Sequence, residues 1–382
     1  MISQIWRVNL ATMLYFTFIQ LVVPLIPRYA LTIGATPFLI GLAVSSISVT
    51  AILIRPISGV VSDRWSRSWM MVLGIAFGAC GYAILALSEG IYFVMAARLL
   101  EGVGVALFVP SSMASAVDSA PEGKVGETLG WRSLMIGLGF MVGPALGGFL
   151  AEAFGYKSTF ALTVVLIVAL LPLVIFKEKG RTIERKGFFM DGIKERGFLL
   201  SFSSLLVYAI SWMGLLTFLS AYLKAIGYGD LEIGLFVSVQ ALSSLALRVI
   251  AGRVADRLPE AMTYLGLMVV SASFFMIYLN PLPPFLYGAS VIFGIGIGVF
   301  IPGSQTLALR KAPPYSRGFL SSIYTMGIDV GNLIGPLLFG TIIQATGSYE
   351  SSFAVAPILT MAAALVVFIP SILRGRSNDA KG

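Results

Sequence analysis

The segment Arg55-Pro-Ile-Ser-Gly59-Val-Val-Ser-Asp63-Arg64 recurs later in the chain as Arg248-Val-Ile-Ala-Gly252-Arg-Val-Ala-Asp256-Arg257. Arginine, glycine, aspartate and arginine keep their order and spacing at an offset of 193 residues. Three dipeptides repeat at an offset of 192, namely Val109-Pro110 as Ile301-Pro302, Ala120-Pro121 as Ala312-Pro313, and Gly143-Pro144 as Gly335-Pro336. A period near half the chain is far too long for a solenoid repeat, so the sequence consists of two homologous halves.

The composition places both halves in a membrane. The 382-residue chain is 57% hydrophobic and 12% charged, whereas soluble domains carry about 25% charged residues. Its mean hydropathy is +0.92. About twelve apolar runs approach or exceed the roughly 20 residues that span a bilayer as a helix. They cover residues 7–29, 38–61, 68–88, 91–117, 127–150, 158–177, 198–223, 232–254, 260–280, 284–310, 317–345 and 351–373.

We therefore expect an all-α membrane protein with two pseudo-symmetric six-helix bundles. The first bundle covers residues 1–177, and the second, with a short tail, covers 198–382. Residues 178–197 between them are strongly polar and are predicted to be a cytoplasmic linker. The first apolar run is long and lacks a clear cleavage site, so no removable signal peptide is expected. Paired halves in a hydrophobic chain are the building plan of secondary transporters.

Basic residues are distributed unevenly between the two sides of the predicted spans. Twenty of the 26 lysines and arginines lie on the side that holds both termini, whereas Arg28, Lys157 and Lys224 lie on the other side. Because basic loops stay in the cytoplasm, both termini are expected there, in a multi-pass protein of the cell membrane. The net charge of +8 reflects this topology. The lipid bilayer is therefore an expected partner, and nucleic acid is not.

The chain lacks the residue types that most cofactor and catalytic sites require. It contains no histidine and a single cysteine, Cys80. We therefore expect no metal site, no cofactor and no internal disulfide. The sequence also shows no Ser/His/Asp set and no phosphate-binding loop, which argues against an enzyme. Any proton coupling must use carboxylates.

Several motifs resemble those of the major facilitator superfamily, and the resemblance covers essentially the whole chain. Residues 59–67 resemble its signature loop between spans two and three, with Ser66 where the family usually has glycine, and residues 252–257 are a weaker second copy. The stretch Arg98-Leu-Leu-Glu101-Gly102-Val-Gly104 resembles the span-four motif of drug:proton antiporters. Residues 24–29, Pro-Leu-Ile-Pro-Arg-Tyr, resemble the end of span one in the twelve-span efflux branch. The span-five antiporter motif is matched by Gly139, Gly143, Pro144, Gly147 and Gly148.

Glycines at four-residue spacing form a stripe in each half. The stripes consist of Gly139, Gly143 and Gly147 in the first half and of Gly327, Gly331 and Gly335 in the second. Such stripes let membrane helices approach each other closely. Pro144 and Pro336 follow a glycine of each stripe and are expected to kink both helices.

Two charges exchange sign between the halves. Arg67 falls opposite Glu260, and Asp118 falls opposite Arg310. Two equivalent ion pairs would produce this exchange, so we predict contacts of Arg67 with Asp118 and of Glu260 with Arg310. Coincidence among loop charges would produce the same pattern.

Asp63 and Asp256 keep the same sign in both halves. In the family, the first aspartate caps the start of span eleven, which would lie near Gly318, and the symmetric partner of Asp256 would be span five near Gly126. A carboxylate at a helix N-terminus gains about 0.3–1 kcal/mol when it is exposed. The resemblance and the exchanged charges together predict a gate formed by Gly59, Asp63, Arg64, Arg67, Asp118, Gly252, Asp256, Arg257, Glu260 and Arg310.

Three charges deep inside predicted spans have no counterpart in the other half. The aligned pairs are Arg98 with Ser290, Glu101 with Phe293, and Asp329 with Gly137. An ionisable group at bilayer depth costs about 2.5–3.5 kcal/mol on insertion scales, so a functional role is the default interpretation.

The roles of these lone charges have alternatives. Glu101 lies three residues after Arg98 on one helix face, so the two could simply neutralise each other. Alternatively, Glu101 or Asp329 carries a proton, because burial favours the neutral carboxylate and a nearby cation favours the ionised one. Asp329 is the first choice, since its own helix offers no obvious partner, and its alternative is a static pair with Arg55. Arg55 and Arg248 occur in both halves, which favours a packing role for them.

Spans one, four, seven and ten line a central cavity in the family. In this chain they carry aromatic side chains and few polar groups, which suits a hydrophobic or amphipathic solute. Each residue alone could equally face lipid or pack against a neighbour. The candidates are Tyr15, Phe18, Gln20, Phe108, Tyr208, Trp212, Phe218, Phe300 and Gln305.

These observations favour a monomeric transporter that exports a hydrophobic or amphipathic small molecule in exchange for protons by alternating access. A rival hypothesis is efflux of a polar metabolite, such as a sugar or amino-acid derivative, through the same fold. Another is a lipid flippase that uses a lateral cleft between the halves.

Overall fold

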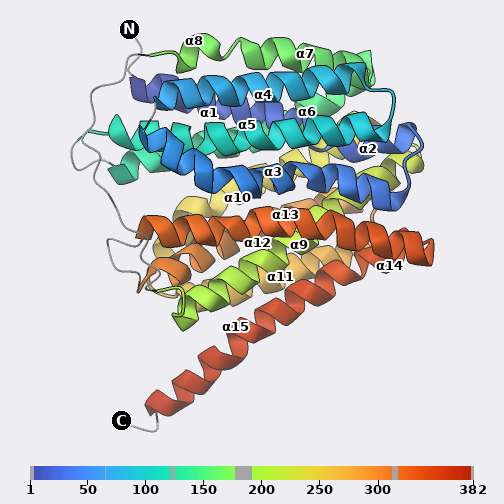
Figure 1. Ribbon diagram of the computed structural model, residues 1–382. Coiled ribbons are helices and arrows are strands. Elements are labelled where there is room, and N and C mark those ends of the chain that lie inside the picture. The colour runs from blue at the N-terminus through green and yellow to red at the C-terminus, as the bar shows by residue number, and fades with distance from the viewer. Residues whose placement is uncertain (1–3, 65, 122–124, 177–191, 312–316, 380–382) are drawn as a thin grey trace. The chain divides into compact units, whose positions relative to one another are not determined.

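The structure is a computed structural model that describes residues 4–64, 66–121, 125–176, 192–311 and 317–379. Every element of the described residues is an α-helix (Figure 1). Twelve segments of these residues are long and apolar enough to cross a membrane. The predicted all-α membrane fold is confirmed.

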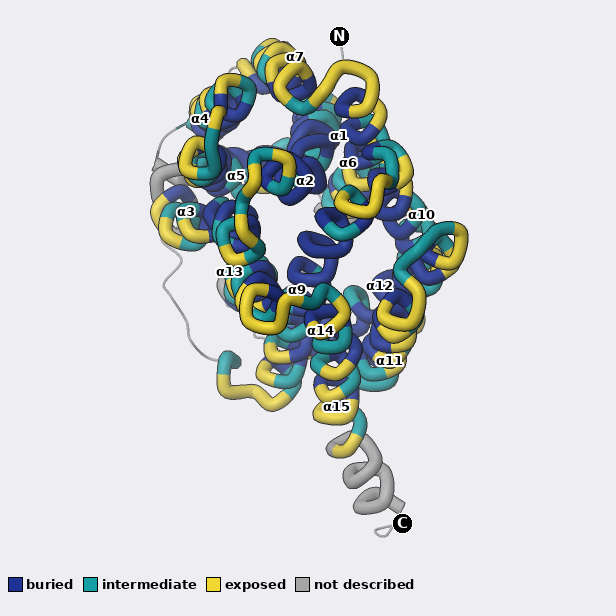
Figure 2. Tube along the Cα trace, turned by 90° about the vertical axis from the view of Figure 1, so that its right-hand side faces the viewer, coloured by how far each residue is buried: buried dark blue, intermediate teal, exposed yellow. Residues whose placement is uncertain are grey.

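The helices follow the predicted spans closely. The first six spans are α1 (Gln4–Val22) with α2 (Leu25–Thr32), α3 (Pro37–Arg64), α4 (Arg67–Leu87), α5 (Ile91–Asp118), α6 (Val125–Phe154), and α7 (Tyr156–Val168) with α8 (Leu171–Val174). The second six are α9 (Arg196–Ala225), α10 (Asp230–Ala255), α11 (Pro259–Leu279), α12 (Phe285–Leu309), α13 (Arg317–Thr346), and α14 (Tyr349–Phe353) with α15 (Val355–Asp379). Within these spans α1 and α9 are the most buried, and α7 with α8 is the least buried (Figure 2).

Prolines act differently in different spans. The first span is interrupted after Val22, because Pro24 and Pro27 have no N–H with which to continue the hydrogen-bond ladder. The Val23 N–H still donates to the Ile19 carbonyl at 2.9 Å, and α2 then begins at Leu25. Pro144 and Pro336 instead lie inside the continuous helices α6 and α13. The kinks expected at these two prolines stay predictions.

Packing divides the chain into two compact units. The first contains Met1–Glu184 and Ser220–Ser238, and the second contains Arg185–Leu219 and Val239–Gly382. The units match the two sequence halves except for Ser220–Ser238, which carries the end of α9 and the beginning of α10. This segment packs with the first unit because its backbone touches α6: a Cβ added at Gly148 would lie 2.2 Å from the Asp230 carbonyl oxygen. The predicted bundle boundaries stay predictions, since most of the linker lies outside the described residues.

Contacts inside the units repeat with the sequence. A Cβ added at Gly102 of α5 would lie 2.1 Å from the Ile47 carbonyl oxygen of α3. A Cβ added at Gly294 of α12 would lie 2.4 Å from the Gln240 carbonyl oxygen of α10. The glycines are related by the offset of 192 and their partners by 193. Each unit therefore holds the same helix pair at backbone contact, where no side chain fits.

The glycine stripes do the same for a second helix pair. Gly147 of α6 touches α1, where an added Cβ would lie 2.2 Å from the Leu21 carbonyl oxygen. Gly335 of α13 touches α9, where an added Cβ would lie 2.3 Å from the Ile210 carbonyl oxygen. The close helix approach predicted from the stripes is confirmed in both units.

Candidate functional site

Arg98 and Glu101 form an ion pair in the interior of the first unit. Nη1 of Arg98 lies 2.6 Å from Oε2 of Glu101, and the two side chains are 1% and 3% exposed. Both residues lie on α5, where a spacing of three places them on one helix face. The mutual neutralisation that was one alternative is therefore present. A proton-carrying role for Glu101 stays a prediction.

The pair is incompletely satisfied by its surroundings. Oε1 of Glu101 and both Nε and Nη2 of Arg98 are buried without a hydrogen-bond partner among the described residues. Gly81 of α4 packs against Glu101, since a Cβ added there would lie 2.8 Å from Cγ of the glutamate. The buried Tyr15 and Tyr82 lie within electrostatic range of the same carboxylate. Most buried polar atoms in folded proteins have a hydrogen-bond partner, so the atoms of this pair that lack one make it a candidate functional site.

The second unit has aromatic residues at the equivalent place. Phe293 occupies the position of Glu101, and its ring lies 4.4 Å from that of Trp212 and 5.0 Å from that of Phe274, between centroids. Phe274 is itself the counterpart of Tyr82 at the offset of 192. The second unit thus builds the same helix scaffold without an ion pair at this place.

Four of the aromatic cavity candidates form a repeated pair. The rings of Tyr15 and Phe108 are stacked, with centroids 3.7 Å apart. Their counterparts Tyr208 and Phe300 lie 5.3 Å apart. A pair that recurs in both units is what packing produces, so this geometry favours a structural role.

The other cavity candidates show a range of exposure. Phe18 and Phe218 are buried, Gln20 and Trp212 are half-buried, and Gln305 is exposed. Contact of any of these side chains with a substrate stays a prediction.

Arg67 and Asp118 form the ion pair that the exchanged charges predict. Arg67 begins α4 and Asp118 ends α5, so the pair ties these two helix ends together. The contact is confirmed, and its function as a gate stays a prediction.

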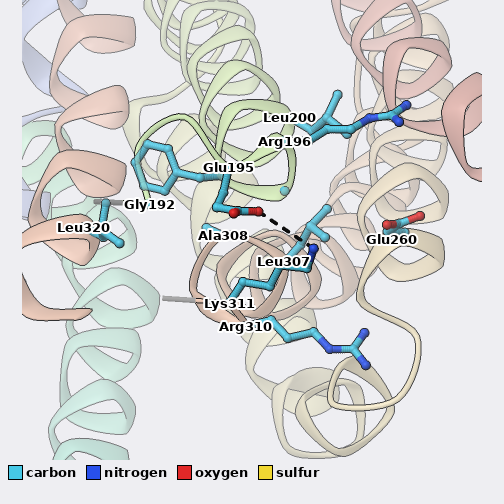
Figure 3. Close-up of a pocket in the computed structure, with 12 residues that line it drawn as sticks. Gly192, Glu195, Arg196, Leu200, Glu260, Leu307, Ala308, Arg310, Lys311 and Leu320 are labelled. Carbon is cyan, nitrogen blue, oxygen red and sulfur yellow. Dashed lines mark ion pairs between the residues drawn. The ribbon is translucent and has the colours of Figure 1, made fainter. Parts of the chain in front are cut away.

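The equivalent charges of the second unit lie around a cavity of about 120 Å³ (Figure 3). Glu260 and Arg310 both line it, and the ion pair drawn there joins Lys311 to Glu195 at 3.8 Å. The contact of Glu260 with Arg310 therefore stays a prediction.

The remaining gate candidates are described unevenly. Gly252, Asp256 and Arg310 line a second cavity of about 470 Å³ together with Gln305, and Arg257 is exposed beside it in sequence. The side chains at Asp63 and Arg64 lie outside what the structure describes, as does the burial of Gly59, so the predicted roles of these residues stay predictions. Helices α6 and α13 begin at Val125 and Arg317, close to the expected starts near Gly126 and Gly318. Capping of these helix starts by Asp63 and Asp256 stays a prediction.

Asp329, the first choice for proton coupling, lies half-buried in the middle of α13. This position lies within the predicted span 317–345, as expected from the sequence. Its protonation, and the alternative of a static pair with Arg55, both stay predictions.

Sequence reasoning missed a buried network around Arg28. It treated Arg28 and Lys224 as charges on the far side, but Arg28 is fully buried in α2, with Nη1 3.0 Å from Oδ1 of Asp230. Nζ of Lys224 lies 2.7 Å from Oδ2 of the same carboxylate, and the Tyr156 hydroxyl donates to Oδ1 at 2.9 Å. The sequence carried no signal for this network, because Arg28 and Asp230 lie in different halves of the repeat.

Arg132 is a second buried cation that sequence reasoning missed. It lies on α6, and its Nη2 donates to Oγ of Ser112 at 2.8 Å and to the Val109 carbonyl at 3.3 Å. It lies near the start of the predicted span 127–150, and the available signal was its alignment with the uncharged Tyr324 of the second half.

Comparisons with known proteins agree with this architecture. The multidrug resistance efflux pump PmrA of Streptococcus pneumoniae is 27% identical over 370 residues, which cover 91% of this chain and 92% of the pump. Multidrug resistance protein 1 of Bacillus subtilis is 24% identical over 360 residues, which cover 90% of this chain and 91% of that protein.

Solved structures show the same fold at low sequence identity. A bacterial homologue of the human lysosomal transporter Spinster superposes with a TM-score of 0.81 at 14% identity, over 96% of each chain. The nucleoside transporter NupG gives 0.75 at 14% identity, over 96% of this chain and 99% of that one. The sequence model of the Major Facilitator Superfamily matches residues 8–204 and 200–381. This chain, which has two helical units related by a 192-residue repeat, belongs to the Major Facilitator Superfamily and resembles its drug-efflux branch.

Proposed function

We propose that this transporter exports a hydrophobic or amphipathic small molecule in exchange for protons, by alternating access. The observation that carries the coupling is the buried pair of Arg98 and Glu101, which the second unit replaces with Ser290 and aromatic packing. The relatives named as multidrug efflux pumps support the direction and the substrate class. On this proposal the protein is a monomer in the cell membrane with both termini in the cytoplasm.

Glu101 is the group that carries the proton on this proposal. While Nη1 of Arg98 lies 2.6 Å from Oε2 of Glu101, the arginine compensates a negative charge on the carboxylate. When water or substrate separates the two, an unpaired charge at this depth costs several kcal/mol, and taking up a proton removes that cost. Oε1 of Glu101 and the Nε and Nη2 donors of Arg98 have no hydrogen-bond partner among the described residues. Each side chain can therefore form a new hydrogen bond when the pair separates.

Asp329 is the second candidate carboxylate, on α13 of the other unit. Proton coupling can therefore use both Glu101 and Asp329, or only one of the two carboxylates. Substitution of each separately decides between these possibilities.

The test uses purified protein in vesicles that carry an imposed pH gradient. We expect the unaltered protein to move a fluorescent amphipathic compound against its gradient, driven by protons. Glu101→Gln removes the titrating group but keeps the size and one hydrogen-bonding oxygen. The variant should lose gradient-driven accumulation and keep passive exchange of labelled for unlabelled compound.

Glu89→Gln is the matched control, because Glu89 is an exposed carboxylate of the same unit. It should behave like the unaltered protein. If Glu101→Gln and Asp329→Asn both retain gradient-driven transport, the carboxylate assignment is wrong. The alternative of a polar substrate is tested by measuring the thermal stability of the purified protein with a panel of compounds that includes a sugar and an amino-acid derivative. A compound that binds and is present at 100 times its Kd adds about 2.7 kcal/mol to the apparent stability.

A further inference from the structure

Arg132 differs from the other buried arginines of the described residues. Arg28, Arg67 and Arg98 are each paired with a carboxylate. Arg132 is 6% exposed and donates only to neutral oxygens, those of Ser112 and Val109. No ion pair joins Arg132 to a carboxylate among the described side chains. Since a buried charge costs several kcal/mol unless it is paired, this guanidinium is under-compensated in the absence of a ligand.

Other polar atoms near this level of the first unit also lack partners. Both side-chain amide atoms of Asn9 and the hydroxyl of Ser115 are buried without a hydrogen bond to the described residues. Ser115 lies three residues after Ser112, which accepts from Arg132, and so it shares a face of α5 with that serine. Nε of Arg132 itself is buried without a partner.

Two aromatic residues place Asn9 at the same level. Trp6 precedes Asn9 by one turn of α1, and Trp131 precedes Arg132 by one residue on α6. Their rings pack with centroids 5.5 Å apart. Helices α1, α5 and α6 therefore bring the four polar residues to one level of the unit.

The second unit shows what the scaffold requires at this level. The counterparts are Tyr324 for Arg132, Ser304 for Ser112, Leu307 for Ser115 and Phe202 for Asn9. The Tyr324 hydroxyl lies 3.0 Å from Oγ of Ser304. This contact repeats the one between Arg132 and Ser112 without the charge. The second unit thus has only a neutral hydrogen bond at this place, and the cation with its polar neighbours is additional in the first unit.

We propose that Arg132, with Asn9 and Ser115, binds the anionic group of the transported molecule, a carboxylate, sulfonate or phosphate. A guanidinium binds two oxygens of such a group through parallel N–H donors, and Nε of Arg132 is free to be one of them. The amide of Asn9 and the hydroxyl of Ser115 add neutral donors. The inference rests on the proposed transport function and adds the charge of its substrate.

The test compares two probes that differ in one charge, a fluorescent coumarin carboxylate and the corresponding carboxamide. Equilibrium binding to the purified full chain is measured without any pH gradient. The unaltered protein should bind the carboxylate more tightly than the amide. Arg132→Tyr, which introduces the residue of the second unit and keeps a donor for Ser112, should weaken carboxylate binding about tenfold or more, as expected for loss of a desolvated charge contact.

The same variant should leave carboxamide binding within about twofold, so that selectivity disappears. Arg132→Lys should keep part of the preference, because the charge remains without the planar fork. Tyr324→Phe, which removes the equivalent hydrogen bond in the second unit, should change neither affinity. If Arg132→Tyr does not fold, Asn9→Ala is measured in its place, and selective loss of carboxylate affinity is again expected.

Three results overturn the inference: equal affinity of the unaltered protein for both probes, equal weakening of both by Arg132→Tyr, or binding of neither. Gradient-driven transport is measured separately with a neutral amphipathic compound. If that transport persists alongside any of these results, the proposed function stands and the anion site alone is wrong. If binding is selective for the anion but transport is not driven by protons, the anion site stands and the proposed proton coupling is wrong.

Discussion

The Arg28 guanidinium and the Asp230 carboxylate form a buried ion pair at 3.0 Å although 202 residues separate them in the chain. Asp230 begins α10, which the sequence assigns to the second half, yet its segment Ser220–Ser238 packs with the first unit. The loops after spans one, five and seven lie on one side of the twelve-span chain. The network of Arg28, Asp230, Lys224 and Tyr156 is therefore at the membrane side opposite Arg67 and Asp118.

Removing one partner of this network should destabilise the protein strongly. Arg28→Ala leaves Asp230 with Lys224 and Tyr156, and breaking a buried pair typically costs about 3–5 kcal/mol. We expect a lower midpoint in thermal and denaturant unfolding of the purified protein. Lys157→Ala is the control, because Lys157 is an exposed cation next to Tyr156, and it should cost less than about 0.5 kcal/mol. Equal effects of the two substitutions would show that Arg28 contributes nothing through its charge.

Reversing the ion pair of Arg67 and Asp118 should be tolerated better than reversing one partner. Arg67→Asp alone places two like charges together, whereas the double change with Asp118→Arg restores attraction. The second half carries the reversed charges, Glu260 and Arg310, at the equivalent positions. Asp118 is 40% exposed, so the coupling free energy from a double-mutant cycle should be about 0.2–1 kcal/mol. A double variant no better than the worse single variant would count against the pair.

Removing the cation that pairs with Glu101 should make the free energy of unfolding depend on pH. Arg98→Ser removes the cation and leaves a buried carboxylate, so we expect a loss of about 3–5 kcal/mol where the carboxylate is ionised. Protonation removes the stranded charge, so this variant should regain stability as the pH falls. Adding Glu101→Phe, the residue pair of the second unit, should restore stability and abolish the pH dependence. Unfolding midpoints across pH test this, and a flat profile for Arg98→Ser would contradict it.

Alanine should have opposite effects at two glycines of α6. At Gly147 the new Cβ would lie 2.2 Å from the Leu21 carbonyl, so α1 and α6 must separate, at a cost of about 1–3 kcal/mol. At Gly130 nothing lies within 4 Å, and alanine should stabilise the helix by about 0.5–1 kcal/mol. Unfolding midpoints of the two variants measured side by side check the sign of each effect. A gain at Gly147 would show that the helices are not held at backbone contact.

Sequence reasoning succeeded where both copies of a feature were visible. The span count follows from hydropathy, and the contact of Arg67 with Asp118 follows from two charges that change sign together. It failed for Arg28 and Asp230, because those residues come from different halves and have no repeated counterpart to compare. Packing of Ser220–Ser238 onto α6 brings them together, and hydropathy carries no record of that packing.

The burial of Arg132 was missed for a different reason. It lies near the start of its span, where a cation is ordinarily a charge facing water. Its burial depends on hydrogen bonds to α5, which supplies Ser112 and the Val109 carbonyl. The alignment of Tyr324 with Arg132 was available in the sequence, but its meaning required the contact of Tyr324 with Ser304.

The backbone contacts of Gly102 with Ile47 and of Gly294 with Gln240 also constrain how the two gene halves can diverge. A distance set by touching main chains leaves no room for a side chain, so a residue larger than glycine at Gly102 or Gly294 would push the two helices apart. Residues at equivalent positions thus evolved within one fixed frame. The residue that one unit carries at a given position is therefore a candidate substitution at the equivalent position of the other unit.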